Sequence, residues 1–397
     1  MTKWTRGFAH YGRDSRGTES WERFFSLAPL PALLLLFAAQ TGKPLQVETQ
    51  SSSVGKRLPE QPVSRKPVET AHLSLYRSSH EAMGTLYTME IYARSQDEAN
   101  GLFELAFDEV DRIDSLLSNY QPSSELIRIT EGAPKGPITT DPETFRFLER
   151  SLFWSEESGG AFDITVGPLL KAWGFFFHGG RIPSDSELAS LRKTIGWNKV
   201  LLDPMTRTVR FRDATQLDLD PGSIGKGFAV DRVVQLLRSA NVDAALISAG
   251  GSTIYGIGAP PGEPGWTVNI PSPVGTNGPP APVLLRDSSL STGACTEKFF
   301  IKEGHRYCHI FNPQTMRPVE GTIQTTVIDP SATDSDALST VVFVLGDQGS
   351  LALLSRFPEA SALIFRDGSS GPRCIAIRWP SGSCSDLKTG MNQGVKQ

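Results

Sequence analysis

The chain has 397 residues, with 39 lysines and arginines against 43 aspartates and glutamates, so its formal net charge is −4. This near balance argues against a basic surface that follows a phosphate backbone, and we expect no nucleic-acid partner. The four cysteines form no CxxC pair and have no metal-ligand spacing, and they are too few for a disulfide framework. Cys374 and Cys384 would pair in an oxidising compartment, but free thiols are the favoured expectation.

The N-terminal segment carries a targeting signal. Several arginines precede an apolar run from Leu27 to Ala39, which has the length of the central part of a signal peptide and is short for a membrane span. Residues 1–40 are therefore predicted to be a signal peptide, with an uncleaved N-terminal anchor as the alternative. We expect an exported protein, either periplasmic or anchored to the outer face of the inner membrane.

A polar segment with several prolines and serines follows the apolar run. Residues 41–72 are predicted to be a disordered tether, because this composition supplies no core. The folded domain is expected over residues 73–380, and residues 381–397 are predicted to be a flexible tail.

The first elements of the folded domain are expected to be two strands and a helix. Apolar and polar residues alternate over residues 73–93, which predicts paired strands that turn at Met83-Gly84. Ser95 and Glu98 then form a capping box, and the apolar residues after them recur at helical spacing. This pattern predicts a helix with one buried stripe.

Two further helices and a mixed second half follow. One helix is predicted to begin at Asp141-Pro142, and another at the capping box that starts with Ser184. Two short strands are expected around the turn at Asp203-Pro204. Residues 217–251 then predict a strand, a turn, a helix and a strand in that order. Because strands and helices mix without strict alternation, the fold class is predicted to be α+β, with mixed sheets packed against helices.

The first candidate site is the segment Asp220-Pro-Gly-Ser-Ile-Gly-Lys226-Gly, which is rich in small residues and runs directly into the start of a predicted helix. Free backbone N–H groups and the positive end of the helix dipole would attract an anion, and the glycines would let a phosphate approach. Lys226 adds a positive charge in the first turn. The alternative is an ordinary helix start with a solvated lysine, which a short glycine-rich motif does not exclude.

The second candidate opens the last predicted helix, at Thr333-Asp-Ser-Asp336-Ala-Leu-Ser-Thr340. Asp336 and Thr340 are four residues apart, so their oxygens project from one face of the helix. Such oxygens suit Mg²⁺, which takes one or two carboxylates and completes its shell with substrate phosphate and water. The alternative is that Asp336 only caps a buried helix.

The third candidate is His309, at the end of a predicted strand and just before an Asn-Pro turn. A histidine there would act as an acid or base, or would hold phosphoryl oxygens. The alternative is a structural histidine, which is the commoner case for a single histidine in a strand. Met83 and Tyr120 would also suit the faces of a flat aromatic ligand, although each alone is explained equally well by core packing.

Seven motifs occur in one order along the chain and together resemble the FAD:protein FMN transferase (ApbE-like) family. They run through most of residues 73–379 and read Ala-Met-Gly-Thr from Ala82, Ser-Asn-Tyr from Ser118, Phe-Asp-Ile-Thr-Val-Gly-Pro-Leu from Phe162, Gly-Ser-Ile-Gly-Lys-Gly-Phe-Ala-Val-Asp from Gly222, Ser-Ala-Gly-Gly from Ser248, His-Ile-Phe-Asn-Pro from His309 and Ser-Asp-Ala-Leu-Ser-Thr from Ser335. The resemblance implies that residues 73–380 are the FMN transferase domain, with the T-fold-like α+β architecture of that family.

The resemblance also implies roles for single residues. The positions that match FAD contacts in the family are Met83, Tyr120, Ala161, Phe162, Asp163, Asp220, Lys226 and Ile310. Asp336 and Thr340 match its magnesium ligands, and a backbone carbonyl placed at Ser223, with Gly225 as the alternative, would complete the protein's share of the metal shell. His309 and Asp336 are the residues expected to take part in catalysis.

The implied reaction takes FMN from FAD, attaches it through a phosphoester to a threonine or serine of an acceptor protein, and releases AMP. Mg²⁺ and Lys226 would stabilise charge on the pyrophosphate. Either His309 or Asp336 would take the proton of the attacking hydroxyl, and the sequence does not separate the two. Because the family modifies membrane-associated redox proteins, a redox protein is the expected acceptor, and the N-terminal segment would tether the enzyme to a membrane.

The chain departs from the family pattern at three places. Gly293-Ala294 and then Cys295 stand where the family commonly has other residues, Ser252 follows the glycine pair where an acidic residue or asparagine is frequent, and Met316 replaces a turn glycine that would adopt positive φ. None of these changes removes a predicted metal ligand. The alternative functions are a Mg²⁺-dependent FAD pyrophosphatase that releases free FMN and AMP, and a non-catalytic periplasmic flavin-binding protein.

Overall fold

The computed structural model describes residues 72–176, 179–270, 273, 282–296, 298–368, 373–380 and 384. The predicted signal or anchor over residues 1–40 lies outside these residues, as does the tether up to residue 71. The predicted tail over residues 381–397 also lies outside them, except for Cys384.

An eight-stranded sheet forms the centre of the folded part, and each strand is antiparallel to its neighbours. The strands follow the spatial order β1-β2-β6-β7-β10-β15-β16-β17. Their bounds are β1 Ser74–Ala82, β2 Thr85–Ala93, β6 Ala244–Ala249, β7 Thr253–Gly258, β10 Ser288–Ala294, β15 Thr322–Asp329, β16 Ser361–Arg366 and β17 Arg373–Ile377.

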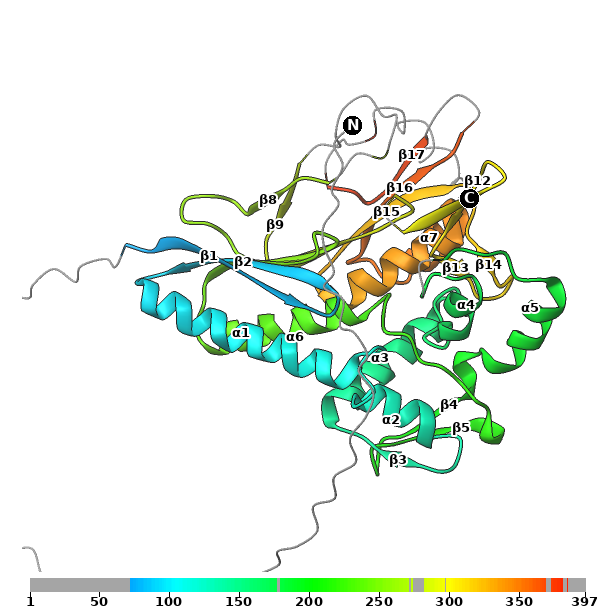
Figure 1. Cartoon of the computed structure of the whole chain (residues 1–397). Helices are drawn as coiled ribbons and strands as arrows, with labels where there is room; N and C mark the ends of the chain where they lie inside the picture. The colour runs from blue at the N-terminus through cyan, green and yellow to red at the C-terminus, as the bar shows by residue number, and fades with distance from the viewer. Residues whose placement is uncertain are drawn as a thin grey trace, which may run out of the picture. The chain divides into compact units, whose positions relative to one another are not determined.

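Three long helices, α1 (Gln96–Leu117), α6 (Gly225–Ser239) and α7 (Ala332–Leu354), lie along one face of this sheet (Figure 1). Their apolar side chains and those of the sheet form the main core. A ribbon of β8 (Trp266–Val268) and β9 (Val283–Leu285) packs on a second cluster, which includes Leu290 and Phe365. The α+β class with mixed sheets and helices is therefore confirmed.

Helix α7 is long and apolar enough by composition to cross a membrane, with a mean hydropathy of 1.5 over its apolar window. More than half of that window is buried inside the domain, against β10 and β15 among other elements. We therefore describe α7 as the central core helix of this domain.

Smaller helices and strands lie in the segments that connect the strands of the central sheet and its long helices. The helices are α2 Glu125–Gly132, α3 Pro142–Glu157, α4 Gly167–Ala172, α5 Asp185–Leu191 and the 3-10 turns Arg192–Thr194, Trp197–Lys199 and Arg212–Ala214. A small sheet has the order β3-β5-β4, and two hairpins pair β11 with β12 and β13 with β14. These strands are β3 Ile138–Thr139, β4 Val200–Asp203, β5 Thr208–Phe211, β11 Phe299–Lys302, β12 His305–Cys308, β13 Phe311–Asn312 and β14 Arg317–Pro318.

The local sequence signals locate most of these elements correctly. Met83 and Gly84 form the β1–β2 turn with φ of 51° and 67°, the positive values that a tight hairpin needs. Ser95 caps α1 by accepting a hydrogen bond from the Glu98 N–H, and the Glu98 carboxylate accepts one from the Arg94 N–H. The predicted helix starts at Asp141 and Ser184, and the β4–β5 pair, are also confirmed.

Two predictions are wrong. Residues 217–220 form no strand, because no neighbouring strand pairs with them; Leu217 and Leu219 are buried as an extended segment, and the Asp220 N–H donates to the Ile164 carbonyl. Cys374 and Cys384 are not free thiols but form a disulfide with a Cα–Cα distance of 5.6 Å, because Cys384 lies beside β17 although it is 10 residues away in the sequence.

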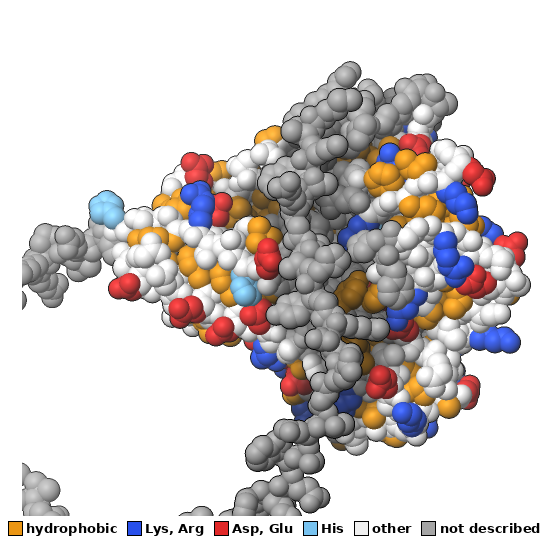
Figure 2. All heavy atoms as spheres, in the orientation of Figure 1, with side chains coloured by type: hydrophobic (Ala, Val, Ile, Leu, Met, Phe, Trp, Pro, Cys, Tyr) orange, Lys and Arg blue, Asp and Glu red, His pale blue; other side chains and the backbone are white. Residues whose placement is uncertain are grey.

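Acidic and basic side chains are interspersed on the face of the molecule shown in Figure 2. That face therefore presents no extended field of one sign.

Candidate active site

Asp336 is the central charged group of the site. It lies in the second turn of α7 and is only 5% exposed. The Gly227 N–H donates to Oδ2 at 3.0 Å, the Thr253 hydroxyl donates to Oδ1 at 3.1 Å, and Lys226 Nζ lies 3.8 Å from Oδ1. Ser331 is the residue that caps α7, so the alternative in which Asp336 is only a cap is wrong.

A close crossing of α6 and α7 brings Lys226 to Asp336. A β-carbon at Gly227 would lie 2.1 Å from the Ala332 carbonyl oxygen and 2.8 Å from the β-carbon of Asp336. Any larger residue at position 227 would therefore push the two helices apart. The sequence predicts Gly227 as part of an anion site, but the structure requires a glycine there for the close contact between the two helices.

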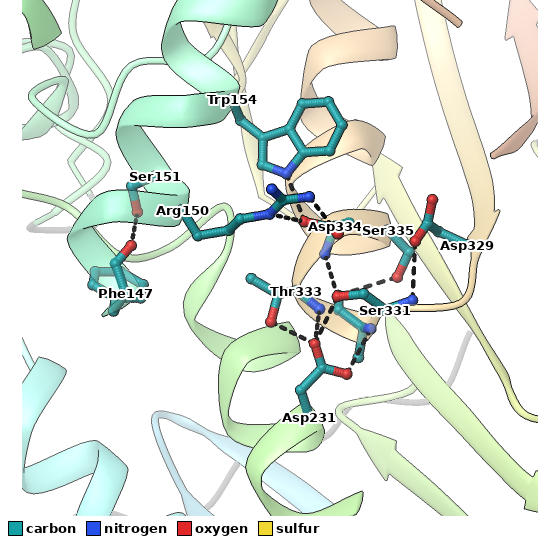
Figure 3. A network of polar contacts seen from close by, with 11 residues as sticks. Phe147, Arg150, Ser151, Trp154, Asp231, Asp329, Ser331, Thr333, Asp334 and Ser335 are labelled. Carbon is teal, nitrogen blue, oxygen red and sulfur yellow. Dashed lines mark hydrogen bonds and ion pairs between the residues drawn. The ribbon is translucent and has the colours of Figure 1, made fainter. Parts of the chain in front are cut away.

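The start of α7 is held by two partly buried carboxylates (Figure 3). Asp231 of α6 accepts hydrogen bonds from the hydroxyls of Ser331 and Thr333 and from the N–H groups of Ala332 and Thr333, at 2.6 to 2.9 Å. On the other side, Asp334 accepts two hydrogen bonds from the Arg150 guanidinium and one from the Trp154 indole. Because Asp336 follows within one turn, these contacts also fix its position.

The residues at this crossing fit a Mg²⁺ ion that shares its shell with phosphate. The Asp336 carboxylate is buried, has no cation within hydrogen-bonding distance among the described residues, and keeps lone pairs beyond the two that it uses. No group of three His, Cys, Asp or Glu side chains that could hold a metal occurs in the described part of the chain. Substrate phosphate and water would therefore have to supply the other ligands.

The two other predicted metal ligands each have an oxygen atom without an intramolecular partner among the described residues. Thr340 is half-buried one turn after Asp336 on α7, and its hydroxyl has no hydrogen-bond partner among the described residues. Ser223 lies in the turn before α6. If the helix began earlier, the Ser223 carbonyl would accept a hydrogen bond from the Gly227 N–H, but this N–H donates to Asp336. The Ser223 carbonyl is thus available to a ligand.

Met83 faces the start of α6 from the β1–β2 turn. Its N–H donates to Asp114 at 3.2 Å, and its sulfur accepts a hydrogen bond from the Tyr87 hydroxyl at 3.1 Å. Burial raises the pKa of Tyr87, and the charges of Asp336 and Asp114 raise it further, so the phenol stays protonated. The sequence did not single out Tyr87, because it reads as an ordinary inward residue of a strand.

Asp220 joins the end of α1 to the turn before α6. Asn119 donates to its Oδ2 at 2.9 Å and the Gly222 N–H donates to its Oδ1 at 2.8 Å. Burial raises the pKa of Asp220, while these hydrogen bonds oppose the rise. Tyr120 beside it is 70% exposed, and its ring stacks on that of Phe176 with centroids 4.6 Å apart.

The segment Ala161-Phe162-Asp163 is buried. The Asp163 carboxylate accepts hydrogen bonds from the Thr165 N–H and hydroxyl and from the Trp197 N–H, at 2.7 to 3.1 Å. Asp163 therefore holds a turn in place, beside a cavity of about 190 Å³ lined in part by Trp197 and Met316. The next residue, Ile164, connects this segment to Asp220 through its carbonyl.

His309 follows β12 and has one ring nitrogen fixed. Nδ1 lies 2.9 Å from the Lys298 carbonyl, so Nδ1 carries the proton and Nε2 is the basic nitrogen. Burial lowers the pKa of His309 to about 4, and the charges of Lys298 and Lys226 contribute to the shift. Lys226 therefore lies near both His309 and Asp336. Ile310, in contrast, is buried in an apolar cluster with Phe343, so only its backbone is placed beside the histidine.

The lowered pKa of His309 predicts a pH-dependent part of the stability. Between its ordinary pKa of 6.5 and the folded value of about 4, the unfolded chain binds the additional proton, so stability falls as the pH is lowered through this window and is fully present above it. We expect His309→Gln to lose less stability than the wild type between about pH 7 and about pH 5 in urea unfolding. An equal loss in both proteins would contradict the assignment of a buried neutral ring.

Met316 adopts the positive φ expected of the turn glycine that it replaces, with φ of 61°, yet its side chain is only 1% exposed. The conformation costs about 1 kcal/mol for a non-glycine residue, whereas removing a buried methionine side chain costs roughly 2 kcal/mol or more. We therefore expect Met316→Gly to lower the free energy of unfolding by about 1–3 kcal/mol. A more stable variant in urea titration would mean that the backbone strain exceeds the packing.

The sequence profile of the ApbE family matches residues 83–365, which include every predicted site residue. The chain belongs to the ApbE family. Membership also establishes it as a transferase, because its curated relatives are named FAD:protein FMN transferases.

Two relatives show how far the similarity of this ApbE-family protein extends. The Treponema pallidum FAD:protein FMN transferase is 33% identical over 314 residues, which cover 75% of this chain and 86% of that protein. The Escherichia coli protein of the same name is 27% identical over 314 residues, with 77% and 88% covered. The match thus extends over the folded domain of this chain.

Solved structures agree with the fold of this ApbE-family protein. The apo Pseudomonas stutzeri flavinyl transferase ApbE superimposes with a TM-score of 0.69 at 27% identity, over 77% of this chain and 95% of that one. The Thermotoga maritima ApbE protein gives a TM-score of 0.68 at 28% identity, over 77% and 97%. The predicted ApbE-like architecture is confirmed.

Proposed function

We propose that this protein is a Mg²⁺-dependent FAD:protein FMN transferase, which moves FMN from FAD to a threonine or serine of an acceptor protein and releases AMP. The observation that carries the proposal is the buried Asp336 carboxylate, 3.8 Å from Lys226 and bonded to the first turn of α6. A nearly buried carboxylate beside one lysine attracts a further cation. That cation and the lysine would together hold a pyrophosphate.

The flavin side of the substrate would lie between the β1–β2 turn and the end of α1. Met83 offers a polarisable sulfur whose orientation is fixed by Tyr87, and Tyr120 offers an exposed aromatic face. Asp220 and the backbone of Ala161 and Phe162 would hold the remainder of FAD. This arrangement supports a flat aromatic substrate with an anionic centre.

The reaction forms one bond and breaks one. The acceptor hydroxyl oxygen attacks the phosphorus of the FMN half, the bond from that phosphorus to the bridging oxygen breaks, and AMP leaves with the bridging oxygen. Mg²⁺, when bound at Asp336, would supply charge stabilisation for the phosphoryl oxygens. Lys226 adds a second positive charge at the same place.

His309 is suited to take the proton of the acceptor hydroxyl. Its Nδ1–H is held by Lys298, which leaves Nε2 unprotonated at neutral pH because the pKa is about 4. Asp336 is the rival base, but both of its oxygens already accept hydrogen bonds. We therefore favour His309, and Lys226 is the group that would bring the phosphate toward it.

The reaction is proposed to take place outside the cytoplasm. The proposed acceptor is a membrane-associated redox protein. The disulfide between Cys374 and Cys384 supports an oxidising compartment, and the apolar run Leu27 to Ala39 supports export. The same run would tether the enzyme to the membrane if it is not cleaved.

Product analysis tests the proposal against its two rivals. The full chain is incubated with FAD and Mg²⁺, with and without a threonine-bearing acceptor domain of a redox protein, and AMP and free FMN are separated by chromatography. A transferase releases AMP in step with acceptor labelling and yields little free FMN. Equal free FMN and AMP without acceptor would identify a pyrophosphatase, and retained FAD with no AMP would identify a flavin-binding protein.

A further inference from the structure

Two buried cysteines lie together beside the catalytic histidine, and the proposed reaction uses neither of them. Cys295 follows β10 directly and is 7% exposed, and Cys308 ends β12 and is 1% exposed. Both are free thiols in one apolar cluster with Ile310 and Phe343. The two thiols are therefore neighbours in a cluster of only a few buried side chains.

The backbone around the pair brings the two sulfurs together from two different elements. The Cys295 N–H donates to the Ile323 carbonyl of β15 at 3.0 Å, which fixes that residue to the central sheet. Cys308 lies opposite Phe299 in the β11–β12 hairpin, at the end of the hairpin nearest Cys295. The two cysteines therefore enter one buried cluster from two different parts of the chain.

The charges around the pair make the two thiols unequal. The neighbouring Cys308 thiol lowers the pKa of Cys295, the Arg306 guanidinium lowers it further, and burial and Asp367 oppose the shift. Burial raises the pKa of Cys308. Cys295 is also the more exposed of the two thiols, at 7% against 1%, so Cys295 is the thiol that attacks and Cys308 is the one that follows.

We propose that Cys295 and Cys308 are a reversible disulfide site that controls the position of His309. The compartment that keeps Cys374 and Cys384 joined would also oxidise a second pair that shares one buried cluster. Access comes through the β11–β12 hairpin, which pairs only with itself among the described strands and has exposed residues from Ile301 to Arg306.

The oxidant is an external disulfide, and the exchange balances. The Cys295 thiolate attacks one sulfur of that disulfide, which forms a mixed disulfide and releases one thiol. The Cys308 sulfur then attacks Cys295, which closes the internal bond and releases the second thiol. Two electrons and two protons pass from the cysteine pair to the external disulfide.

A Cys295–Cys308 bond would affect His309 because each cysteine lies within three residues of a backbone group that holds this histidine. His309 follows Cys308 directly, and its Nδ1 and its N–H both contact the carbonyl of Lys298, three residues after Cys295. Closing the bond draws the sulfurs to about 2 Å and shifts these two backbone segments relative to each other. A small displacement of a catalytic group lowers the rate strongly. We therefore expect the oxidised form to transfer FMN at about one tenth of the rate of the reduced form, or at a still lower rate.

Thiol counting tests the bond without reference to activity. The full chain is incubated with oxidised glutathione, denatured, alkylated, and mapped by peptide mass spectrometry without reduction. We expect both Cys295 and Cys308 to be alkylated before oxidation, and a Cys295–Cys308 peptide to replace them afterwards and to disappear with dithiothreitol. Two thiols that remain alkylatable after oxidant, in a protein that keeps its fold, would overturn the proposal.

The effect on rate rests on the proposed function, whereas bond formation does not. Cys295→Ser is the matched variant, because it changes one buried sulfur to oxygen and leaves Cys308 without a partner. Oxidant should slow AMP release by the wild type and leave this variant unchanged. If the bond forms and the rate does not change, the link to His309 is wrong; if no AMP is released by the reduced wild type, the proposed function fails instead.

Discussion

Replacing Asp336 with asparagine is expected to lower the rate of AMP release from FAD by roughly 10²–10³-fold, because several kcal/mol of charge stabilisation would be lost. The substitution keeps the size of the side chain while removing the negative charge that lies 3.8 Å from Lys226 at the helix crossing. Its amide would also place donors against the Gly227 N–H or the Thr253 hydroxyl. The measurement is AMP formed at saturating FAD over a range of Mg²⁺ concentrations.

Asp334→Asn is the matched control for this prediction. Asp334 lies two residues earlier on the same helix and bonds to Arg150 and Trp154, so its loss affects the anchoring of α7 and not the charge at the crossing. We expect Asp334→Asn to be less stable but to keep its dependence on Mg²⁺. An Asp336→Asn protein with wild-type rate and wild-type Mg²⁺ response would remove Asp336 from the metal site.

Replacing Asp231 with asparagine is expected to cost about 2–4 kcal/mol of the free energy of unfolding. The Asp231 carboxylate accepts four hydrogen bonds at the start of α7, and its Oδ1 and Oδ2 both act as acceptors. An asparagine can accept on one side only, so its amide group would oppose a buried donor on the other. Urea unfolding followed by circular dichroism measures the difference.

Asp97→Asn provides the comparison at an exposed helix start. Asp97 lies in the first turn of α1 and is exposed, so its loss should cost only a few tenths of a kcal/mol through the helix dipole. If Asp231→Asn were as mild as Asp97→Asn, the network in Figure 3 would not be what fixes the start of α7.

The parts of the fold that the sequence predicts well are those encoded by neighbouring residues. The start of α1 at Ser95 and the turn at Met83-Gly84 depend on short-range chemistry, and both are correct. The strand expected at residues 217–220 is absent, because whether an extended apolar segment joins a sheet depends on a partner elsewhere in the chain. The Cys374–Cys384 bond was missed for a related reason, since pairing depends on where the chain returns.

The site shows the same contrast between features set by neighbouring residues and features set by distant contacts. Lys226 and Asp336 were both identified from local motifs and from the family resemblance, but their meeting depends on a contact between residues 109 positions apart, Gly227 and Asp336. Thr253 donates to Asp336 and carried no local signal, because a threonine in a strand has many ordinary roles. Ile310 stays a prediction as a flavin contact, and because its side chain packs in the apolar cluster with the two free cysteines, such a contact would use its backbone.

Intact mass of an acceptor domain is the most direct test of FMN transfer. The full chain is incubated with FAD, Mg²⁺ and an acceptor, beside an acceptor variant in which the target threonine is valine, and each acceptor is weighed by mass spectrometry. We predict that the threonine form gains the mass of FMN less one water, with equimolar AMP, and that the valine form gains nothing. An unlabelled threonine acceptor, in the presence of bound FAD and with several acceptors tried, would contradict the assignment of this protein as an FMN transferase.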